Sequence, residues 1–347
     1  MNATAQAITD IKKTLGKNVY ILGHHYQNDA IVAHCDKTGD SLELSRCVPD
    51  IEADHIVFCG VHFMGETAAL LARPGQSVHL PDLSSSCTMS MMTPAAIARK
   101  VLKQLTASGR KITPLAYVNT TLDIKALVGE YGGGVCTSAN AGKMLAWALK
   151  QGDSVLFLPD KHLGRNTAKK LWLSAEDWHI LRINKTGLAD GESREIDRPL
   201  LLWPGCCCIH TRFTPDMIAA ARAAHPGCRI LAHPESRPEV IERCDADGST
   251  AFLIKESMRF AEESPGSTLY IATEYNLVHR LATRCKGRCR ILSPIRSICG
   301  DMAKVTAKKL LRTLTDISKG KSAPLAVEPA QVEPARLSLT RMLEICA

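Results

Sequence analysis

The segment LLLWPGCCCIHTRF, residues 200–213, joins a short apolar run to three consecutive cysteines and a histidine. A run of branched apolar residues that ends in polar residues is typical of a strand buried inside a parallel sheet. Unpaired cysteine is either a small buried hydrophobic residue or, as a thiolate, a metal ligand. The segment therefore predicts a strand whose carboxyl end carries Cys206, Cys207 and Cys208, and both interpretations of the cysteines stay open at this point.

The same pattern recurs along the whole chain. Apolar runs rich in Val, Ile and Leu alternate with helical patterns, which is typical of parallel sheets flanked by helices. The runs form three comparable groups, so we predict an α/β fold of three pseudo-repeated αβα three-layer domains with parallel sheets. The runs lie at residues 19–26, 55–63 and 77–83, at 112–120, 134–140 and 154–164, and at 200–206, 228–235, 247–253 and 269–274. Ligands of such sheets gather beyond the carboxyl ends of the strands.

Two polar segments interrupt this alternation of apolar runs and helical patterns. Residues 166–198 separate the second group from the third, and we expect them to form an inserted surface excursion. Residues 319–335 are rich in Pro and Ala, which predicts an extended linker before a final short helix. We also expect the helices after residue 300 to pack on the first domain. The predicted domains are 1–84, 85–199 and 200–299, followed by C-terminal helices and linker over 300–347.

Composition narrows the class of protein. The chain has 347 residues, of which 45% are hydrophobic and 22% charged, an ordinary balance for a globular protein. The net charge of +8 comes from scattered Lys and Arg, and only 5% of residues are aromatic, which argues against a base-stacking nucleic-acid surface. No apolar stretch reaches the ~18 residues of a membrane span, and the first residues lack a signal-peptide core. We therefore expect a cytoplasmic protein that binds neither nucleic acid nor membrane.

The chain has fourteen cysteines, which we do not expect to form a disulfide framework in a cytoplasmic protein. Reducing compartments keep thiols free, so metal binding or redox chemistry is the leading explanation for some of them. Cys87, Cys207 and Cys299 follow strand-like runs, one in each third of the chain. Cys285 and Cys289 form a lone CxxxC among basic residues, which does not match a paired zinc motif and is a coincidence of helix face or loop.

Ten motifs in order give the chain a specific resemblance to the quinolinate synthases, iron-sulfur enzymes of de novo NAD biosynthesis. The resemblance covers roughly residues 15–345. The motifs are GHHYQ (23–27), GDSLELSR (39–46), CGVHFMGETA (59–68), AYVNT (116–120), TSAN (137–140), LPDKHLGR (158–165), WPGCCCIH (203–210), HPE (233–235), GST (248–250) and CGDMAK (299–304).

This resemblance implies a cofactor and its ligands. It implies a 4Fe-4S cluster at the centre of the three domains, held by Cys87, Cys207 and Cys299. Cys207 is preferred within the triplet because the family spacing is CxxH, which ends here at His210. Three thiolates leave one iron of the cluster without a protein ligand, and that iron would act as a Lewis acid for dehydration.

The resemblance also implies the reaction, in which iminoaspartate and dihydroxyacetone phosphate condense to quinolinate, phosphate and water. Glu235 is implied as the general base, which requires burial to raise its pKa toward neutrality. From the residues alone, an HPE segment after a strand is more often part of a loop, and each Ser or Thr is more often a plain helix cap. The implied catalytic residues are Glu235, His233, Tyr26 and His24. The implied substrate-binding residues are His24, Ser41, Tyr117, Asn119, Ser138, His210, His233, Glu235, Ser249 and Thr250.

Other functions remain open from sequence. One is another iron-sulfur hydro-lyase acting on a different hydroxy acid, and another is a non-catalytic iron-sulfur sensor that binds nucleic acid through its basic surface. A zinc protein is the third. For the enzyme, the family also implies a functional link with L-aspartate oxidase or aspartate dehydrogenase.

Overall fold

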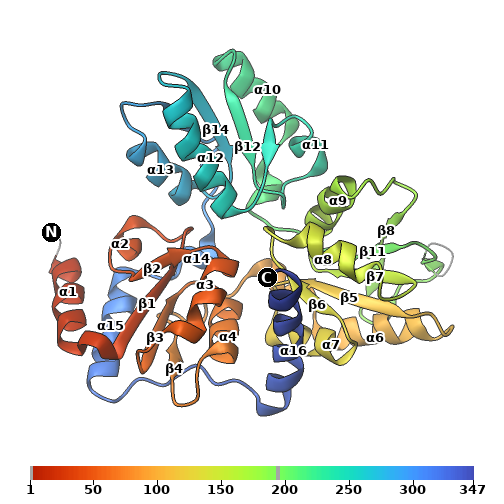
Figure 1. The fold of residues 1–347 in the computed structure, drawn as a ribbon, viewed down its shortest axis with the longest axis horizontal. Helices are drawn as coiled ribbons and strands as arrows, with labels where there is room; N and C mark the ends of the chain where they lie inside the picture. Colours follow the sequence, from red (N-terminus) through yellow and green to blue (C-terminus); the bar gives the residue numbers. More distant parts are fainter. Residues whose placement is uncertain (1–2, 193–195) are drawn as a thin grey trace. The chain divides into compact units, whose positions relative to one another are not determined.

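The computed structural model describes residues 3–192 and 196–347 and shows an α/β protein (Figure 1). Within these ranges the main strands form three sheets, and every strand pairing in them is parallel. Helices flank the sheets, which confirms the predicted fold class. The chain divides into two compact units: the first comprises the chain up to Cys87 with Asp216–Ala232 and Cys244–Val327, and the second Thr88–Pro215, His233–Arg243 and Glu328–Ala347. The predicted domain boundaries stay predictions.

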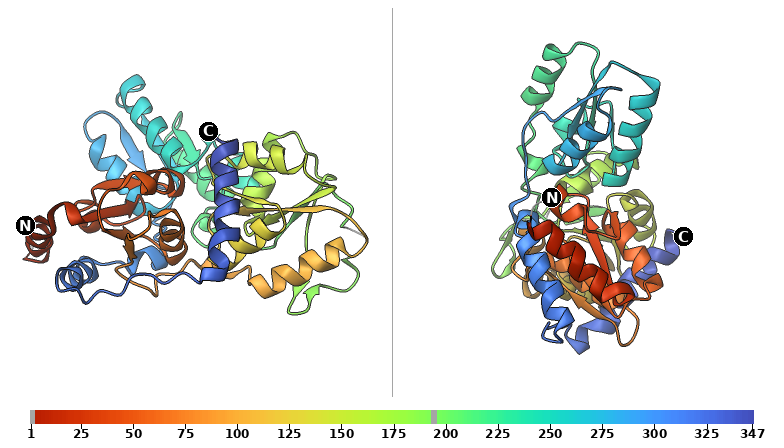
Figure 2. Two further views of the ribbon diagram at one scale, coloured as in Figure 1. Left: turned by 60° about the horizontal axis from the view of Figure 1, so that its bottom comes forward. Right: turned by 90° about the vertical axis from the view of Figure 1, so that its left-hand side faces the viewer.

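The N-terminal sheet of the first unit has the strand order β2-β1-β3-β4. Its strands are β2 (Lys37–Gly39), β1 (Val19–His24), β3 (His55–Cys59) and β4 (Ser77–His79). Helices α1 (Ala3–Leu15) and α15 (Ala307–Ser318) lie side by side against it (Figure 2). Leu310, Leu314 and Ile317 recur every three or four residues, so one face of α15 buries them with Ile21 and Val57 of the strands.

The other sheet of the first unit has the order β13-β12-β14-β15. It consists of β13 (Ala246–Asp247), β12 (Arg229–Ala232), β14 (Thr268–Ala272) and β15 (Arg290–Leu292), with α10 (Pro215–Ala224), α12 (Thr250–Glu263) and α13 (Tyr275–Arg284). Leu231 and Ile271 form a core with Leu281 of α13. Cys285 is buried in the same core and Cys289 packs against it, so this CxxxC belongs to the packing of the unit.

The sheet of the second unit has the order β6-β5-β7-β11-β8. Its strands are β6 (Gly134–Cys136), β5 (Ile112–Tyr117), β7 (Ser154–Leu158), β11 (Leu200–Leu202) and β8 (Trp178–Ile180). All three leucines of β11 are fully buried, because this strand has a neighbour on each side: Leu201 pairs with Leu156 and with His179. That placement accounts for the continuous apolar run at 200–202.

Part of the segment 166–198, for which we expect an inserted surface excursion, belongs to a helix and to the sheet of the second unit. Residues 166–170 end helix α9 (Lys161–Lys170), and β8 extends the sheet as its edge strand. A hairpin of β9 (Ile183–Asn184) and β10 (Gly187–Leu188) follows. The buried Glu192 carboxylate accepts hydrogen bonds from His179, at 2.5 Å, and from the Arg182 backbone and guanidinium. Residues 193–195 of the predicted excursion lie outside the described residues.

The Pro/Ala-rich segment is extended over fewer residues than expected. It runs beside β4, where the Leu325 N–H donates to the Val78 carbonyl at 2.7 Å, but helix α16 already begins at Pro329 and continues to Ile345. Proline fits the first turn of a helix because that turn needs no N–H from it. α16 packs against α7 (Leu122–Glu130) and β6, whereas α15 packs with α1 (Figures 1 and 2).

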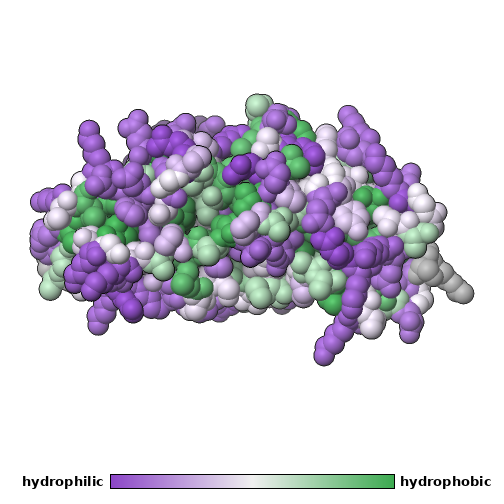
Figure 3. Space-filling model, turned by 90° about the horizontal axis from the view of Figure 1, so that it is seen from below, coloured by the Kyte–Doolittle hydropathy of each residue, from purple (hydrophilic) through white to green (hydrophobic). Residues whose placement is uncertain are grey.

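The remaining helices are short. They are α2 (Asp29–Val32), α3 (Ser41–Cys47), α4 (His62–Leu71), α5 (Thr88–Met91), α6 (Ala95–Thr106), α8 (Ala141–Ala148), α11 (Pro238–Ile241) and α14 (Gly300–Ala303). Among the described residues, no helix combines the length and the apolar character that crossing a membrane requires. Hydrophilic side chains extend from the face drawn in Figure 3, with hydrophobic residues interspersed among them.

Candidate active site

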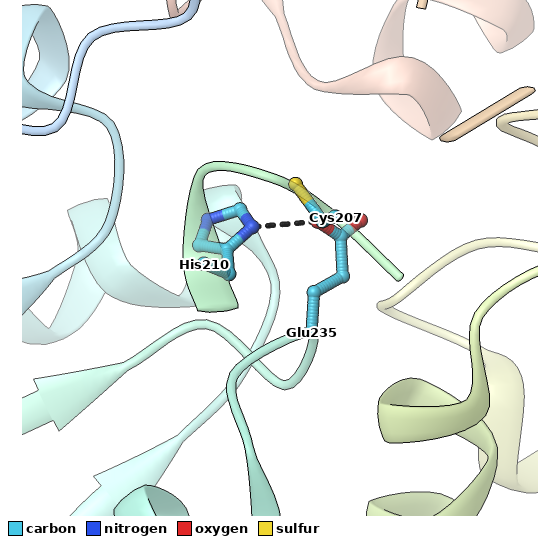
Figure 4. Close-up of side chains that lie close together, drawn as sticks. All are labelled: Cys207, His210 and Glu235. Atoms are coloured by element: carbon cyan, nitrogen blue, oxygen red, sulfur yellow. Dashed lines mark hydrogen bonds and ion pairs between the residues drawn. The ribbon is translucent and has the colours of Figure 1, made fainter. Parts of the chain in front are cut away.

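Cys207, His210 and Glu235 come together in the second unit (Figure 4). Cys207 and His210 lie in the turn after β11, and Glu235 follows β12. One side-chain donor atom from each residue lies within 4.8 Å of the others. The His210 Nδ1 atom lies 2.6 Å from Glu235 Oε2, and both side chains are buried. The geometry is that of a carboxylate–imidazole pair beside a thiol.

The charge state of Glu235 differs from the sequence prediction. Burial raises the pKa of Glu235, but electrostatic interactions with His210 and His233, together with hydrogen bonds from His210 and Tyr117, lower it by more than burial raises it. The net pKa is therefore below that of an ordinary glutamate, so the expected net rise toward neutrality is wrong. The main reason is the electrostatic interaction with His210, whose Nδ1 atom lies 2.6 Å from the carboxylate, and the hydrogen bond between them adds to it.

His233 supports this pair from one side. Its ring stacks on the ring of His210, with centroids 4.4 Å apart and planes 17° from parallel. Burial, followed by the nearby charge of His210, lowers the pKa of His233 to about 3, so this imidazole is neutral at neutral pH. The Asn166 Nδ2 atom donates to the Pro234 and Ser236 carbonyls, each at 2.8 Å, and so fixes the turn that carries Glu235.

The residues expected to contact substrate after β5 and β6 lie in the same unit. Tyr117 ends β5, and its side chain hydrogen-bonds to Glu235. The Asn119 Oδ1 atom is buried and has no hydrogen-bond partner among the described protein groups, as expected of an atom kept for a ligand. Ser138 precedes α8, whose N-cap is Asn140. Its hydroxyl is therefore not the cap of that helix.

Asp160, from the LPDKHLGR motif, is also part of this site. It is fully buried, and its Oδ1 atom accepts the N–H groups of His162 and Leu163 at the start of α9. Its Oδ2 atom is buried without a hydrogen-bond partner among the described groups. Burial and then the charge of Glu235 raise the pKa of Asp160, while nearby N–H groups, including that of Cys207, favour its ionised form. An aspartate that starts a helix looks like an ordinary cap in sequence, which is why it was missed.

A second group of predicted residues lies in the first unit, beyond β1 and at the start of α12. The Tyr26 ring packs edge-on against the His24 ring at 4.7 Å, and the Tyr26 N–H donates to His24 Nδ1 at 3.1 Å. The Thr250 hydroxyl donates to the Tyr26 hydroxyl at 3.3 Å, and Thr273 Oγ1 lies 2.8 Å from the same oxygen. Thr273 was not singled out in the sequence.

The helix-cap alternative holds for one of these hydroxyl residues. Ser249 is the N-cap of α12, and its Oγ atom accepts the Phe252 N–H at 3.3 Å. Ser41 is not a cap, because Asp40 caps α3 and accepts the N–H groups of Leu42 and Glu43. The Ser41 hydroxyl therefore lies at a helix start without being required for the helix itself, which suits an anion.

Cys87 and Cys299 also lie in the first unit, each directly before a helix. Both are half-buried, as is Cys207, whereas Cys208 is exposed. None of the fourteen cysteines, all of which fall in the described ranges, forms a disulfide. Partly accessible thiols at helix starts are suited to ionise and bind soft metal ions, so this donor set fits an iron-sulfur cluster.

Comparison with known proteins agrees with the site. The profile of the family described as "Quinolinate synthetase A protein" matches residues 6–344. The chain is similar to the quinolinate synthases of Bacillus pumilus (41% identity over 98% of this chain and 92% of the relative) and Bacillus subtilis (40%, 97% and 92%). It is also similar to that of Corynebacterium glutamicum, with 40% identity over 97% of this chain and 86% of the relative.

Proposed function

The chain belongs to the quinolinate synthase family, and we propose that it condenses iminoaspartate with dihydroxyacetone phosphate to give quinolinate, phosphate and water. The observation that carries the proposal is the buried His210–Glu235 pair beside the Cys207 thiol. A condensation followed by loss of water needs a group that moves protons at carbon and a centre that receives a departing oxygen. The His210–Glu235 pair would move the protons. The adjacent Cys207 would be a ligand of the metal centre that receives the departing oxygen.

Cys87, Cys207 and Cys299 would hold the 4Fe-4S cluster of this reaction. When bound by three thiolates, such a cluster supplies a Lewis-acidic iron that stabilises negative charge on a leaving oxygen. The donor set supports this assignment, because all three thiols are partly accessible; Cys87 and Cys299 lie directly before helices, and Cys207 lies in the turn before the 3-10 helix His210–Arg212.

Glu235 and His210 move the proton in the proposed mechanism. The ionised Glu235 carboxylate holds the imidazole of His210 in one orientation through the 2.6 Å bond, and the pair accepts a proton from carbon next to a carbonyl group. The neutral His233 ring stacks on His210 and excludes water from its face. The Tyr117 hydroxyl, which bonds to Glu235, would orient the reacting carbonyl.

The hydroxyl groups would bind the anionic parts of the substrates. The Thr250 hydroxyl donates to the Tyr26 hydroxyl, so the Tyr26 O–H would be the donor that points at a phosphate or carboxylate oxygen. Ser41 and Ser138 stand at the starts of α3 and α8, where backbone N–H groups favour an anion.

Activity of the anaerobically purified protein tests the proposal. After reconstitution with iron and sulfide, the protein should show broad iron-sulfur absorbance and form quinolinate from the two substrates. A well-folded sample with a full cluster that forms no quinolinate would overturn the proposed reaction and favour another iron-sulfur hydro-lyase.

The cysteine triplet gives a separate prediction about the ligand. Cys207→Ala should lose the cluster, because only Cys207 lies beside the His210–Glu235 pair. Cys206→Ala and Cys208→Ala should keep it, and they serve as matched controls of the same size. Iron and sulfide per chain measure the outcome, and equal loss in all three variants would contradict the assignment.

A single zinc ion is the competing occupant, because Cys, His and Glu are all zinc ligands and their donor atoms lie within 4.8 Å here. The family relationship favours iron, because the chain belongs to the quinolinate synthases and the family resemblance implies an iron-sulfur cluster. Metal analysis that finds zinc in place of iron would reverse the choice.

The family relationship extends the proposal to partners. We expect a functional link with L-aspartate oxidase or aspartate dehydrogenase and a cytoplasmic location. Co-purification or coupled assays with either enzyme test the link.

A further inference from the structure

The segment Thr273–Asn276, directly after β14, contacts two loops of the first unit that carry site residues. One is the Tyr26 loop, after β1, and the other is the Cys299 loop, before α14. On the first side, Thr273 Oγ1 lies 2.8 Å from the Tyr26 hydroxyl, and the Asn276 Nδ2 atom donates to the Tyr26 carbonyl at 3.3 Å. On the second side, the Tyr275 N–H donates to the Ser297 carbonyl at 2.8 Å.

Glu274 joins the two sides. Its side chain is fully buried, and its Oε1 atom accepts the Cys299 N–H at 3.3 Å and the Asn276 Nδ2 donor at 3.0 Å. Its Oε2 atom accepts the Asn276 N–H at 2.8 Å. The same Asn276 amide group thus bonds to Glu274 and to the Tyr26 loop, which makes one continuous chain of hydrogen bonds from Cys299 to Tyr26.

A plain helix cap does not account for this arrangement. Glu274 is the N-cap of α13, and capping needs only the bond to the Asn276 N–H. Ser, Thr, Asn and Asp serve that purpose with shorter side chains, and burying a carboxylate costs more than burying a hydroxyl. What the longer carboxylate adds is acceptor capacity for several donors at once, including the backbone of Cys299.

We propose that Glu274 is a positioning residue that fixes the Cys299 loop and the Tyr26 loop to one anchor before substrate or cluster is bound. The proposal rests on the proposed function in that Cys299 serves as a cluster ligand and Tyr26 contacts substrate. Preorganised ligand loops lower the ordering cost of binding, so a loosened anchor weakens cluster retention first.

Two substitutions separate positioning from capping. Glu274→Asp keeps a carboxyl group and is a favoured cap, but it withdraws that group by one methylene from the Cys299 N–H. Glu274→Gln keeps the length and an oxygen acceptor for that N–H. Thr306→Ala is the control, because Thr306 caps α15 in the same unit through the Lys309 N–H and bonds to neither loop.

The first measurement needs no cluster. In the full-length apoprotein, the rate of Cys299 alkylation by iodoacetamide is followed by peptide mass mapping. We expect Glu274→Asp to raise this rate on the order of tenfold, the factor that matches the loss of one ordinary hydrogen bond. Glu274→Gln should stay near the wild-type rate, and Thr306→Ala should not change it although the cap is lost.

The second measurement uses the reconstituted holoprotein. A chelator should remove iron from Glu274→Asp faster than from the wild type and from Thr306→Ala. If Glu274→Asp alkylates at the wild-type rate, the inference is wrong and Glu274 is only a cap. If the wild type takes up no cluster, the proposed function fails, and the alkylation rates still decide the role of Glu274.

Discussion

In the proposed mechanism, two neighbouring side chains, His210 and Glu235, move the proton. The interaction with His210, whose Nδ1 atom lies 2.6 Å from the carboxylate, lowers the pKa of Glu235. A carboxylate of low pKa is by itself a weak base. We therefore assign proton transfer to the pair and not to Glu235 alone.

The His210–Glu235 pair leads to a prediction for a variant in which the Glu235 carboxylate is replaced by a neutral amide. Glu235→Gln should lower kcat for quinolinate formation by roughly 10²–10⁴-fold, the range contributed by a positioned acid–base group. Iron per chain should stay at the wild-type value, because the amide fills the same space. Glu239→Gln on α11, whose side chain is 51% exposed, is the control and should keep full activity. Loss of iron in Glu235→Gln would instead make Glu235 a structural part of the metal site.

Some site residues could be predicted from the sequence and others could not. Motif spacing singled out Cys207 and His210, because ligand spacing is a local property of the chain. It did not find Asp160 or Glu274, whose patterns match ordinary helix caps. Nor did it give the direction of the Glu235 pKa, which depends on a histidine 25 positions away that only the fold brings close. The roles of the site residues stay predictions.

Among the elements, α7 and α16 form the closest helix contact of the second unit. The Gly129 Cα atom faces the backbone of α16, and an added Cβ would lie 1.9 Å from the Pro334 carbonyl oxygen. Backbone atoms cannot move aside as a flexible side chain does. The glycine therefore sets how near the two helices approach.

Gly129→Ala should for this reason destabilise the protein. We expect the free energy of unfolding to fall by about 1–3 kcal/mol, the usual cost of forcing extra volume into a packed interface. Gly142→Ala is the matched control: it lies in α8, has no atom within 4 Å of an added Cβ, and should be neutral or slightly stabilising. Chemical denaturation of both variants measures the difference, and equal stability would contradict the packing argument.

Element types were predictable where the apolar pattern is periodic. The leucines at 200–202 predicted a buried strand, and β11 confirms it. The edge strand β8 was missed because its residues are half-buried and polar in part, so their pattern resembles a loop. The start of α16 was missed because its prolines resemble a linker, although packing on α7 stabilises the helix.

At the scale of the whole molecule, buried histidines link stability to pH. Burial, with the nearby His55, lowers the pKa of His79 to about 4, and burial also lowers the pKa of His162 to about 4. The ordinary histidine pKa is ~6.5, so below that pH the unfolded chain binds more protons than the folded one. The free energy of unfolding should therefore fall as the pH drops from about 6.5 toward 4.

His79→Gln tests this linkage. In the wild type, the free energy of unfolding decreases between pH 7 and pH 5. Without the His79 imidazole this decrease should be smaller by about 2 kcal/mol, the value that follows from the shift in the His79 pKa. Urea denaturation of the apoprotein at the two pH values gives the comparison. His279→Gln, at a histidine whose side chain is 58% exposed, should leave the pH dependence as it is in the wild type. A His79→Gln protein with the wild-type loss of stability would contradict the assignment.

The parallel sheets could be predicted from the alternation of apolar runs and helical patterns, because each of these patterns lies within a short stretch of sequence. The assignment of segments to the two compact units could not be predicted from the sequence, because each unit combines segments that are far apart in the chain. A hydrophobic pattern indicates that the apolar face of a sheet must be covered, but it does not indicate which helix covers that face.

The packing of α15 on the N-terminal sheet has a consequence for synthesis on the ribosome. Ile21 and Val57 emerge early, but Leu310 and Leu314, which cover them, are made near the end of the chain. At ribosomal speeds of ~5–20 residues per second, the sheet waits on the order of 15–60 s with apolar surface exposed. During that interval the nascent chain is a natural client for a holding chaperone.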